Sequence, residues 1–223
     1  MDRPYRTLRS ITKWLRWILI ALSLAQGANI VGLILQYRLL AAAQTGSFGA
    51  GFVQAARSND LRQAVIGVFS FVLLLAMIVV FFRWVYRSMA NVRGLGAAGV
   101  DTPARAVGGF FIPIANIILP YISMSQIWRG SENAHSWANG RTSALVGIWW
   151  GLWLAVGVFG FVILFVSRGA HGIAAIANLT VMQLAFNATE IARNLLTVAL
   201  IMRIAALQEA QYARVENQAA IFS

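Results

Sequence analysis

The sequence predicts an all-α fold, a polytopic membrane helix bundle with four spans and one proline-broken helix that is re-entrant or interfacial. The 223 residues are 59% hydrophobic and only 11% charged. The mean hydropathy of +0.70 is far above the range of soluble domains. Four apolar runs are long enough to cross a bilayer, and a fifth carries prolines in its middle.

The net charge of +11 comes from basic residues that cluster at the ends of the apolar runs. In a soluble chain this charge would indicate nucleic acid, but at these positions it is typical of topology signals and of contact with anionic lipid headgroups. We therefore expect the lipid bilayer as a partner and no nucleic acid. Because the chain has no cysteine, disulfides and thiolate chemistry are excluded.

Residues 1–16 form a basic arm that leads directly into span 1, Trp17–Tyr37, a run of 21 residues without charge. A cleaved signal peptide is the alternative, since Ser23, Leu24 and Ala25 resemble a cleavage site. The apolar run continues beyond that site, which favours an uncleaved anchor.

A second helix is predicted after the connector 39–60, which is too polar to span. Ser58, Asn59 and Asp60 have capping side chains, so we expect the helix to begin just after them. Span 2 is 63–82, and the helix continues until a group of glycines that begins at residue 94.

The stretch 106–128 has 23 uncharged residues but contains Pro113, Asn116 and Pro120. A helix begins ahead of it, where Thr102 precedes a proline. Each proline inside a helix removes a hydrogen bond, and hydrocarbon offers no water to replace it. The segment therefore either dips into the membrane and returns, or lies broken against other helices. The spacing places both prolines and Asn116 on one helical face, where the amide can pair with backbone groups freed by the break.

Span 3 is Ser143–Ser167. Gly147, Gly151 and Ala155 follow one another at four-residue steps along it. Small residues at this spacing allow another helix to approach closely, so they predict a helix contact, either within the chain or between subunits.

The last long helix has a polar face, because its polar residues recur at steps of three and four. They are Thr180, Gln183, Asn187, Glu190, Asn194 and Thr197. A span over 180–202 places Glu190 near mid-membrane with Arg193 about one turn further on. The alternative frame, 172–192, leaves both charges at the interface but exposes an apolar run to water.

A charge at the bilayer centre costs about 2.5–3.5 kcal/mol, so Glu190 is a functional candidate. Spaced three apart, Glu190 and Arg193 can form a structural ion pair within one helix, or they can belong to a pathway for a solute or proton. Gln26 and Asn29 in span 1 are suitable cross-helix partners for Gln183 or Asn187 in the last helix.

The positive-inside rule favours the arrangement in which 106–128 does not cross the membrane. Basic residues are then divided 13 to 4 between the two sides, against 10 to 7 if the segment crosses, with Arg193 left out of both counts. We therefore expect a multi-pass protein of the inner membrane with both termini cytoplasmic. Its parts are the arm 1–16, a membrane domain 17–208 and a tail 209–223.

Two stretches, FRWVYRSMANVRGLG at 82–96 and GGFFIPIANIILPYISMSQIWRGS at 108–131, carry a family resemblance. They resemble a bacterial membrane-protein family known as domain of unknown function 4328. The matching residues are Trp84, Arg87, Asn91, Pro113, Asn116, Pro120 and Trp128, and MRIAALQ at 202–208 is similar to the family's closing segment. The resemblance implies a four-helix core and brings no activity with it.

No catalytic constellation is recognisable, and His135 and His171 are isolated, so we expect no enzyme, metal or cofactor. The function that the sequence favours is an accessory, scaffold or assembly subunit working through helix contacts, with other membrane proteins or itself as partners. The alternative is a small channel or transporter that uses the polar face and the broken segment. A water-filled cavity reaching Glu190 would favour the alternative, and a dry, fully paired Glu190 would favour the subunit.

Overall fold

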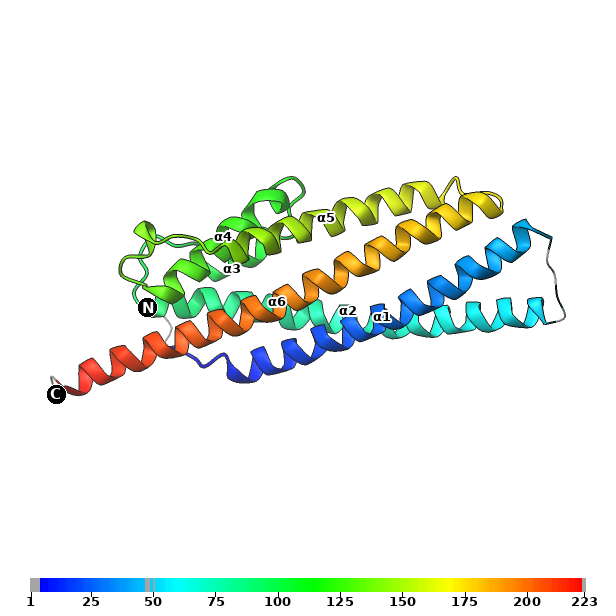
Figure 1. The fold of residues 1–223 in the computed structure, drawn as a ribbon. Coiled ribbons are helices and arrows are strands. Elements are labelled where there is room, and N and C mark those ends of the chain that lie inside the picture. The colour runs from blue at the N-terminus through cyan, green and yellow to red at the C-terminus, as the bar shows by residue number, and fades with distance from the viewer. Residues whose placement is uncertain (1–4, 47–48, 50, 222–223) are drawn as a thin grey trace. The chain divides into compact units, whose positions relative to one another are not determined.

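The computed structural model describes residues 5–46, 49 and 51–221, and these form helices without any strand. The helices are α1 (Arg9–Gln44), α2 (Phe52–Gly94), α3 (Pro103–Gly108), α4 (Ala115–Glu132), the 3-10 helix η1 (Trp137–Asn139), α5 (Ala144–Ser167) and α6 (Ile173–Ile221) (Figure 1). Three of them, α1, α2 and α5, are long and apolar enough to cross a membrane. The all-α prediction is therefore confirmed, and these three helices indicate a membrane protein.

The chain divides into two compact units, and each of the four long helices contributes a segment to both. Unit 1 consists of residues 1–17, 77–151 and 196–223. Unit 2 consists of residues 18–76 and 152–195. All of α3, α4 and η1 belong to unit 1, whereas unit 2 contains only segments of α1, α2, α5 and α6.

The core of unit 1 is built on the last turns of α2, where residues at steps of three and four point inward. Trp84, Val85, Ser88, Met89 and Val92 have no exposed surface. The Trp84 indole nitrogen donates to Thr12 Oγ1 of α1 at 2.9 Å. On α6, Leu200, Ile201 and Ile204 are equally buried. This part of the membrane protein therefore packs like the interior of a soluble domain.

One buried amide, that of Gln208 on α6, connects three elements of unit 1. Its Nε2 donates to Ser88 O at 3.1 Å and to Ser131 Oγ at 3.0 Å, and its Oε1 accepts from Asn91 Nδ2 at 3.0 Å. The same Asn91 amide pairs with the backbone of Arg6, donating to its carbonyl at 2.8 Å and accepting from its N–H at 3.1 Å. The basic arm is thereby attached to α2.

The proline-broken segment forms two helices separated by a turn. As predicted, α3 begins after Thr102, whose Oγ1 accepts from the N–H of Arg105 at 3.2 Å. The break lies before α4, where Ile114 adopts φ 69°, and Asn116 Nδ2 donates to Phe110 O across it at 3.3 Å. Pro120 lies inside α4. Because Pro113 precedes the helix, the prediction that both prolines share one helical face is wrong.

The helix α4 packs against two neighbours within unit 1. The Trp150 indole of α5 donates to Ile117 O at 2.9 Å, and the rings of Tyr121 and Trp150 lie 5.4 Å apart. At Gly130 an added Cβ would come within 2.2 Å of Val92 Cγ1 on α2. Only a residue without a side chain fits this close helix crossing.

The start of α2 differs from the prediction, because the helix begins at Phe52 and Ser58–Asp60 lie inside it. The first helical bond runs from Ala55 N to Gly51 O at 2.9 Å. Residues between this point and span 2 include good helix formers and no proline or glycine, so the helix has no reason to stop there. Asn59 accepts from Arg62 at 3.4 Å instead of capping a helix.

The glycine positions of α5 also differ from the prediction. A Cβ added at Gly147 or Gly151 would meet no described atom within 4 Å, and Gly151 is exposed. Ala155 is half-buried. The prediction of a helix contact within the chain at these two glycines is therefore wrong. A contact between subunits stays a prediction.

Unit 2 exposes large apolar side chains along its helices. Phe161 and Phe165 on α5 are 71% and 70% exposed, and Val65 and Phe69 on α2 are 61% and 55% exposed. Exposed apolar surface on long helices is the expected surface of a protein dissolved in lipid. Gln26, Thr180, Asn187 and Asn194, in contrast, are polar residues buried inside this unit.

Candidate functional site

The polar faces of α1 and α6 meet inside unit 2. Asn29 Nδ2 of α1 donates to Asn187 Oδ1 of α6 at 3.1 Å, so the predicted pairing of these two residues is confirmed. Asn187 Nδ2 in turn donates to the backbone carbonyl of Gln183 at 2.7 Å. The polar face of the last helix is therefore joined to α1 rather than turned toward lipid.

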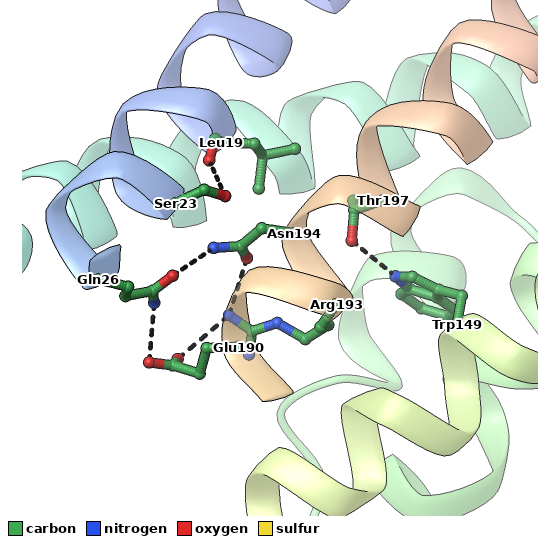
Figure 2. Close-up of polar contacts among 8 residues, drawn as sticks. All are labelled: Leu19, Ser23, Gln26, Trp149, Glu190, Arg193, Asn194 and Thr197. Atoms are coloured by element: carbon green, nitrogen blue, oxygen red, sulfur yellow. Dashed lines mark hydrogen bonds and ion pairs between the residues drawn. The ribbon is translucent and has the colours of Figure 1, made fainter. Parts of the chain in front are cut away.

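Gln26 forms the second connection between these helices, with partners other than those the sequence predicted. Its Nε2 donates to Glu190 Oε2 at 2.8 Å, and its Oε1 accepts from Asn194 Nδ2 at 3.0 Å (Figure 2). Gln26 and Asn194 are buried, at 7% and 1% exposure. A glutamine amide offers a donor and an acceptor, so one side chain binds two residues one turn apart.

Glu190 and Arg193 form the ion pair that their spacing predicts. Arg193 Nη2 lies 3.3 Å from Glu190 Oε1, and both side chains are largely buried, at 15% and 18% exposure. The same Nη2 donates to Asn194 Oδ1 at 3.1 Å (Figure 2). Both carboxylate oxygens of Glu190 thus have a partner, which offsets the cost of holding the charge away from water.

A third connection, which the sequence interpretation missed, involves α2. Gln63 Nε2 donates to Gln36 Oε1 of α1. Gln36 Nε2 donates to Thr180 Oγ1 of α6 at 3.0 Å, and Thr180 donates onward to Ile176 O at 2.8 Å. Glutamines at the ends of apolar runs were the available signal, because an amide in such a position needs a partner.

A cavity of about 290 Å³ lies among these connections in unit 2. All four helices of the unit contribute to its wall, which is lined by Gln26, Asn29, Leu33, Gln63, Ile66, Gly67, Ser70, Ile163, Gln183, Phe186, Asn187 and Glu190. Since a water molecule takes roughly 30 Å³ in the liquid, the space could hold several waters or one small solute.

Several polar groups on this wall are unused by the protein. Among the described residues, none donates to Asn29 Oδ1 or to Gln63 Oε1, and neither the Gln183 amide nor the Ser70 hydroxyl forms a hydrogen bond. A polar group facing a cavity retains its capacity to bind water or a ligand. The wall can therefore hold a small polar molecule through groups that the fold does not need.

The remaining predicted residues lie outside this cavity. Asn116, Pro113 and Pro120 belong to unit 1. So does Thr197, the last residue of the predicted polar face, which accepts from the Trp149 indole at 3.2 Å (Figure 2). In the described part of the chain, no three His, Asp or Glu side chains are grouped as a metal site requires.

Comparison with families of known proteins gives a match over more than half of the chain. Residues 51–206 match the model of a family described as domain of unknown function (DUF4328). The comparison with curated proteins and that with solved structures find no match. Because the matched segment runs from the start of α2 into the second half of α6 and includes the motifs around Asn91 and Pro113, the chain belongs to the DUF4328 family.

Proposed function

We propose that the protein is a small membrane channel or transporter that binds a small polar solute in the cavity of unit 2. The observation that carries this proposal is the cavity of about 290 Å³ that reaches Glu190. Amides that only join helices need no space beside them, whereas here Asn29, Gln63 and Gln183 line a cavity and keep hydrogen-bonding capacity that the described residues do not use. Concave sites with a few convergent polar groups are where small molecules bind.

The topology that we propose has four spans, with α6 crossing over 180–202 and 106–128 remaining on the cytoplasmic side. The distribution of charge supports it. Unit 1 holds 13 basic residues, 5 before residue 18, 6 in 77–151 and 2 after 195, and unit 2 holds the other 5, Arg193 included. The 13 are the residues that the positive-inside rule assigns to the cytoplasm in this arrangement. Both termini are then cytoplasmic in the bacterial inner membrane, with anionic headgroups near the basic side chains.

A second candidate is the accessory or assembly subunit, which two observations favour. Both oxygens of Glu190 already have partners, in Gln26 and Arg193. The open space beside Gly147 and Gly151 also suits the close approach of a helix from another chain. We rank the solute function first, because neither observation accounts for the unused polar groups on the cavity wall.

Solute flux into liposomes containing the purified protein tests the proposal. We expect entry of methylammonium, urea or glycerol to exceed that in protein-free liposomes. Gly67→Leu adds a side chain at the cavity wall and should abolish most of the excess. The matched control is Gly157→Leu, also in unit 2, where an added Cβ meets no described atom within 4 Å and no cavity residue is changed. Flux equal to that of protein-free liposomes for all three solutes would favour the accessory subunit.

A further inference from the structure

We infer that the cavity of unit 2 takes a small organic ammonium ion, an amine that carries a short apolar chain. This inference rests on the proposed function and names the ligand class of the same site. It is carried by three properties of the wall, namely its charge, its unused acceptors and its apolar side.

The charge of the wall favours a cation. Of the twelve lining residues, Glu190 is the only one with an acidic or basic side chain, and Arg193, its partner, is not among them. A carboxylate has about four acceptor sites. Gln26 and Arg193 occupy one on each oxygen, so further donors can bind to Glu190 from the cavity. An anion would meet this carboxylate without a compensating positive group on the wall.

On the wall, the acceptor sites that remain free outnumber the free donors. Gln26, Asn29 and Gln63 each use one of their two amide N–H groups on another side chain, and the Gln183 side-chain amide and the Ser70 hydroxyl keep both donors and acceptors. The carbonyl oxygens Asn29 Oδ1 and Gln63 Oε1 accept from no donor in the described part of the chain and belong to residues on the same wall as Glu190. A primary ammonium group has three donors and no acceptor. It can therefore bind several of these acceptors together with Glu190, and it has no acceptor of its own for which the wall would have to supply a donor.

The rest of the wall is apolar and fits an organic ligand rather than a bare ion. Leu33, Ile66, Ile163 and Phe186 line it. A metal ion is typically held by several charged ligands, whereas this wall carries one carboxylate and the described residues contain no group of three His, Asp or Glu side chains. A short alkyl chain can contact the aliphatic side chains, and the Phe186 ring can attract a cation by its face.

The test measures binding of three four-carbon probes by calorimetry to the full chain in lipid nanodiscs, with protein-free nanodiscs subtracted. The probes are butylammonium, the neutral butyramide and the anion butyrate. Butylammonium should bind more tightly than butyramide, and butyrate should not bind. Comparable binding of butyramide and butylammonium would overturn the ammonium class while leaving the solute cavity in place. If none of the three binds and no flux is found, the proposed function fails as well.

Two variants with matched controls locate the binding. Glu190→Gln should weaken butylammonium binding by about 10- to 100-fold, the range of a lost charge-assisted hydrogen bond, and leave butyramide unchanged. Its control is Glu209→Gln in unit 1, where the carboxylate pairs with Arg9.

If Glu190→Gln does not fold, Phe186→Leu tests the site instead. This variant should weaken the binding of butylammonium by about 2- to 30-fold and leave the binding of butyramide unchanged. Phe165→Leu on the exposed face of α5 is its control. Unchanged butylammonium binding in both variants would contradict the site.

Discussion

At the scale of single residues, buried side-chain amides connect the helices by hydrogen bonds in both units. Gln208 uses its amide for three hydrogen bonds in unit 1, and Gln26 connects Glu190 with Asn194 in unit 2. In a low-dielectric interior such satisfied amides specify which helices meet, because the loss of one leaves several groups unpaired. The amides of the cavity differ in that part of their capacity remains free.

Tyr5 is a residue whose polar group costs stability. Its ring stacks on Tyr212 with centroids 4.3 Å apart, but its hydroxyl is buried without a hydrogen-bond partner in the described part of the chain. Burial, and then the Glu209 carboxylate, raise the pKa of Tyr5 to about 12. The folded protein therefore favours the neutral phenol.

The prediction concerns Tyr5→Phe and its dependence on pH. Below pH 10 the variant should be as stable as the parent or more stable, by up to about 2 kcal/mol, since it keeps the stack and loses an unpaired hydroxyl. Between pH 10 and 12 the unfolded Tyr5 has lost its proton while the folded one has not, so the parent loses stability that the variant keeps. Unfolding in detergent followed by circular dichroism measures this. Tyr37→Phe, at an exposed position, is the control. If the difference in the free energy of unfolding between the parent and Tyr5→Phe did not change with pH, the raised pKa of Tyr5 would be contradicted.

The sequence predicts residue pairs well where the spacing within one helix decides them, and poorly where a partner comes from another helix. The Glu190 and Arg193 pair follows from a spacing of three. The partners of Gln26 depend on the rotation of α1 against α6, which the periodicity of one helix does not determine. Gln183 or Asn187 was therefore predicted where Glu190 and Asn194 are found. Ser70 of the cavity wall was missed because it is a single polar residue in an apolar run, and Gln63 because it follows Arg62 at the end of that run.

At the scale of helices, existence and type could be predicted from hydrophobicity, and the ends only where a breaker or cap is present. The end of α2 at Gly94 and the start of α3 after Thr102 agree with the prediction. The start of α2 does not, because polar side chains at 58–60 permit a helix as well as a cap. Close helix contact was predicted from repeated glycines, but it occurs at Gly130, a single residue that leaves no periodic signal.

We therefore predict opposite effects for alanine at two helical glycines. Gly130→Ala should lower the free energy of unfolding by about 1–3 kcal/mol, because its Cβ would overlap Val92. Gly147→Ala, the matched control, should leave stability unchanged or raise it by up to about 1 kcal/mol, because alanine favours the helix and no described atom is near. Denaturation of both variants in mixed micelles provides the measurement. A loss at Gly147 equal to that at Gly130 would indicate that the α5 glycines contact another subunit.

At the scale of the whole molecule, the distribution of basic residues between the two units is the feature that connects fold with topology. It follows from contacts that bring together residues far apart in the chain, such as the arm, the end of α2 and the end of α6. From the sequence alone, two divisions of the basic residues between the sides of the membrane are possible, because the sequence permits 106–128 either to cross the membrane or to stay on one side. The break at Ile114, and the packing of α4 on α2 and α5, support the arrangement in which it does not.

The last prediction is the side of the membrane on which four exposed positions lie, tested by single cysteines in a chain that has none of its own. With four spans, Gln54→Cys and His171→Cys react with an impermeant maleimide from outside the cell, and Ser136→Cys and Asn217→Cys react only after permeabilisation. All four positions are exposed, so access is decided by the membrane. If 106–128 crosses, Ser136 and Gln54 share a side and His171 lies opposite. If α6 does not cross, Asn217 instead joins His171 outside, and Glu190 with its cavity loses its place within the bilayer.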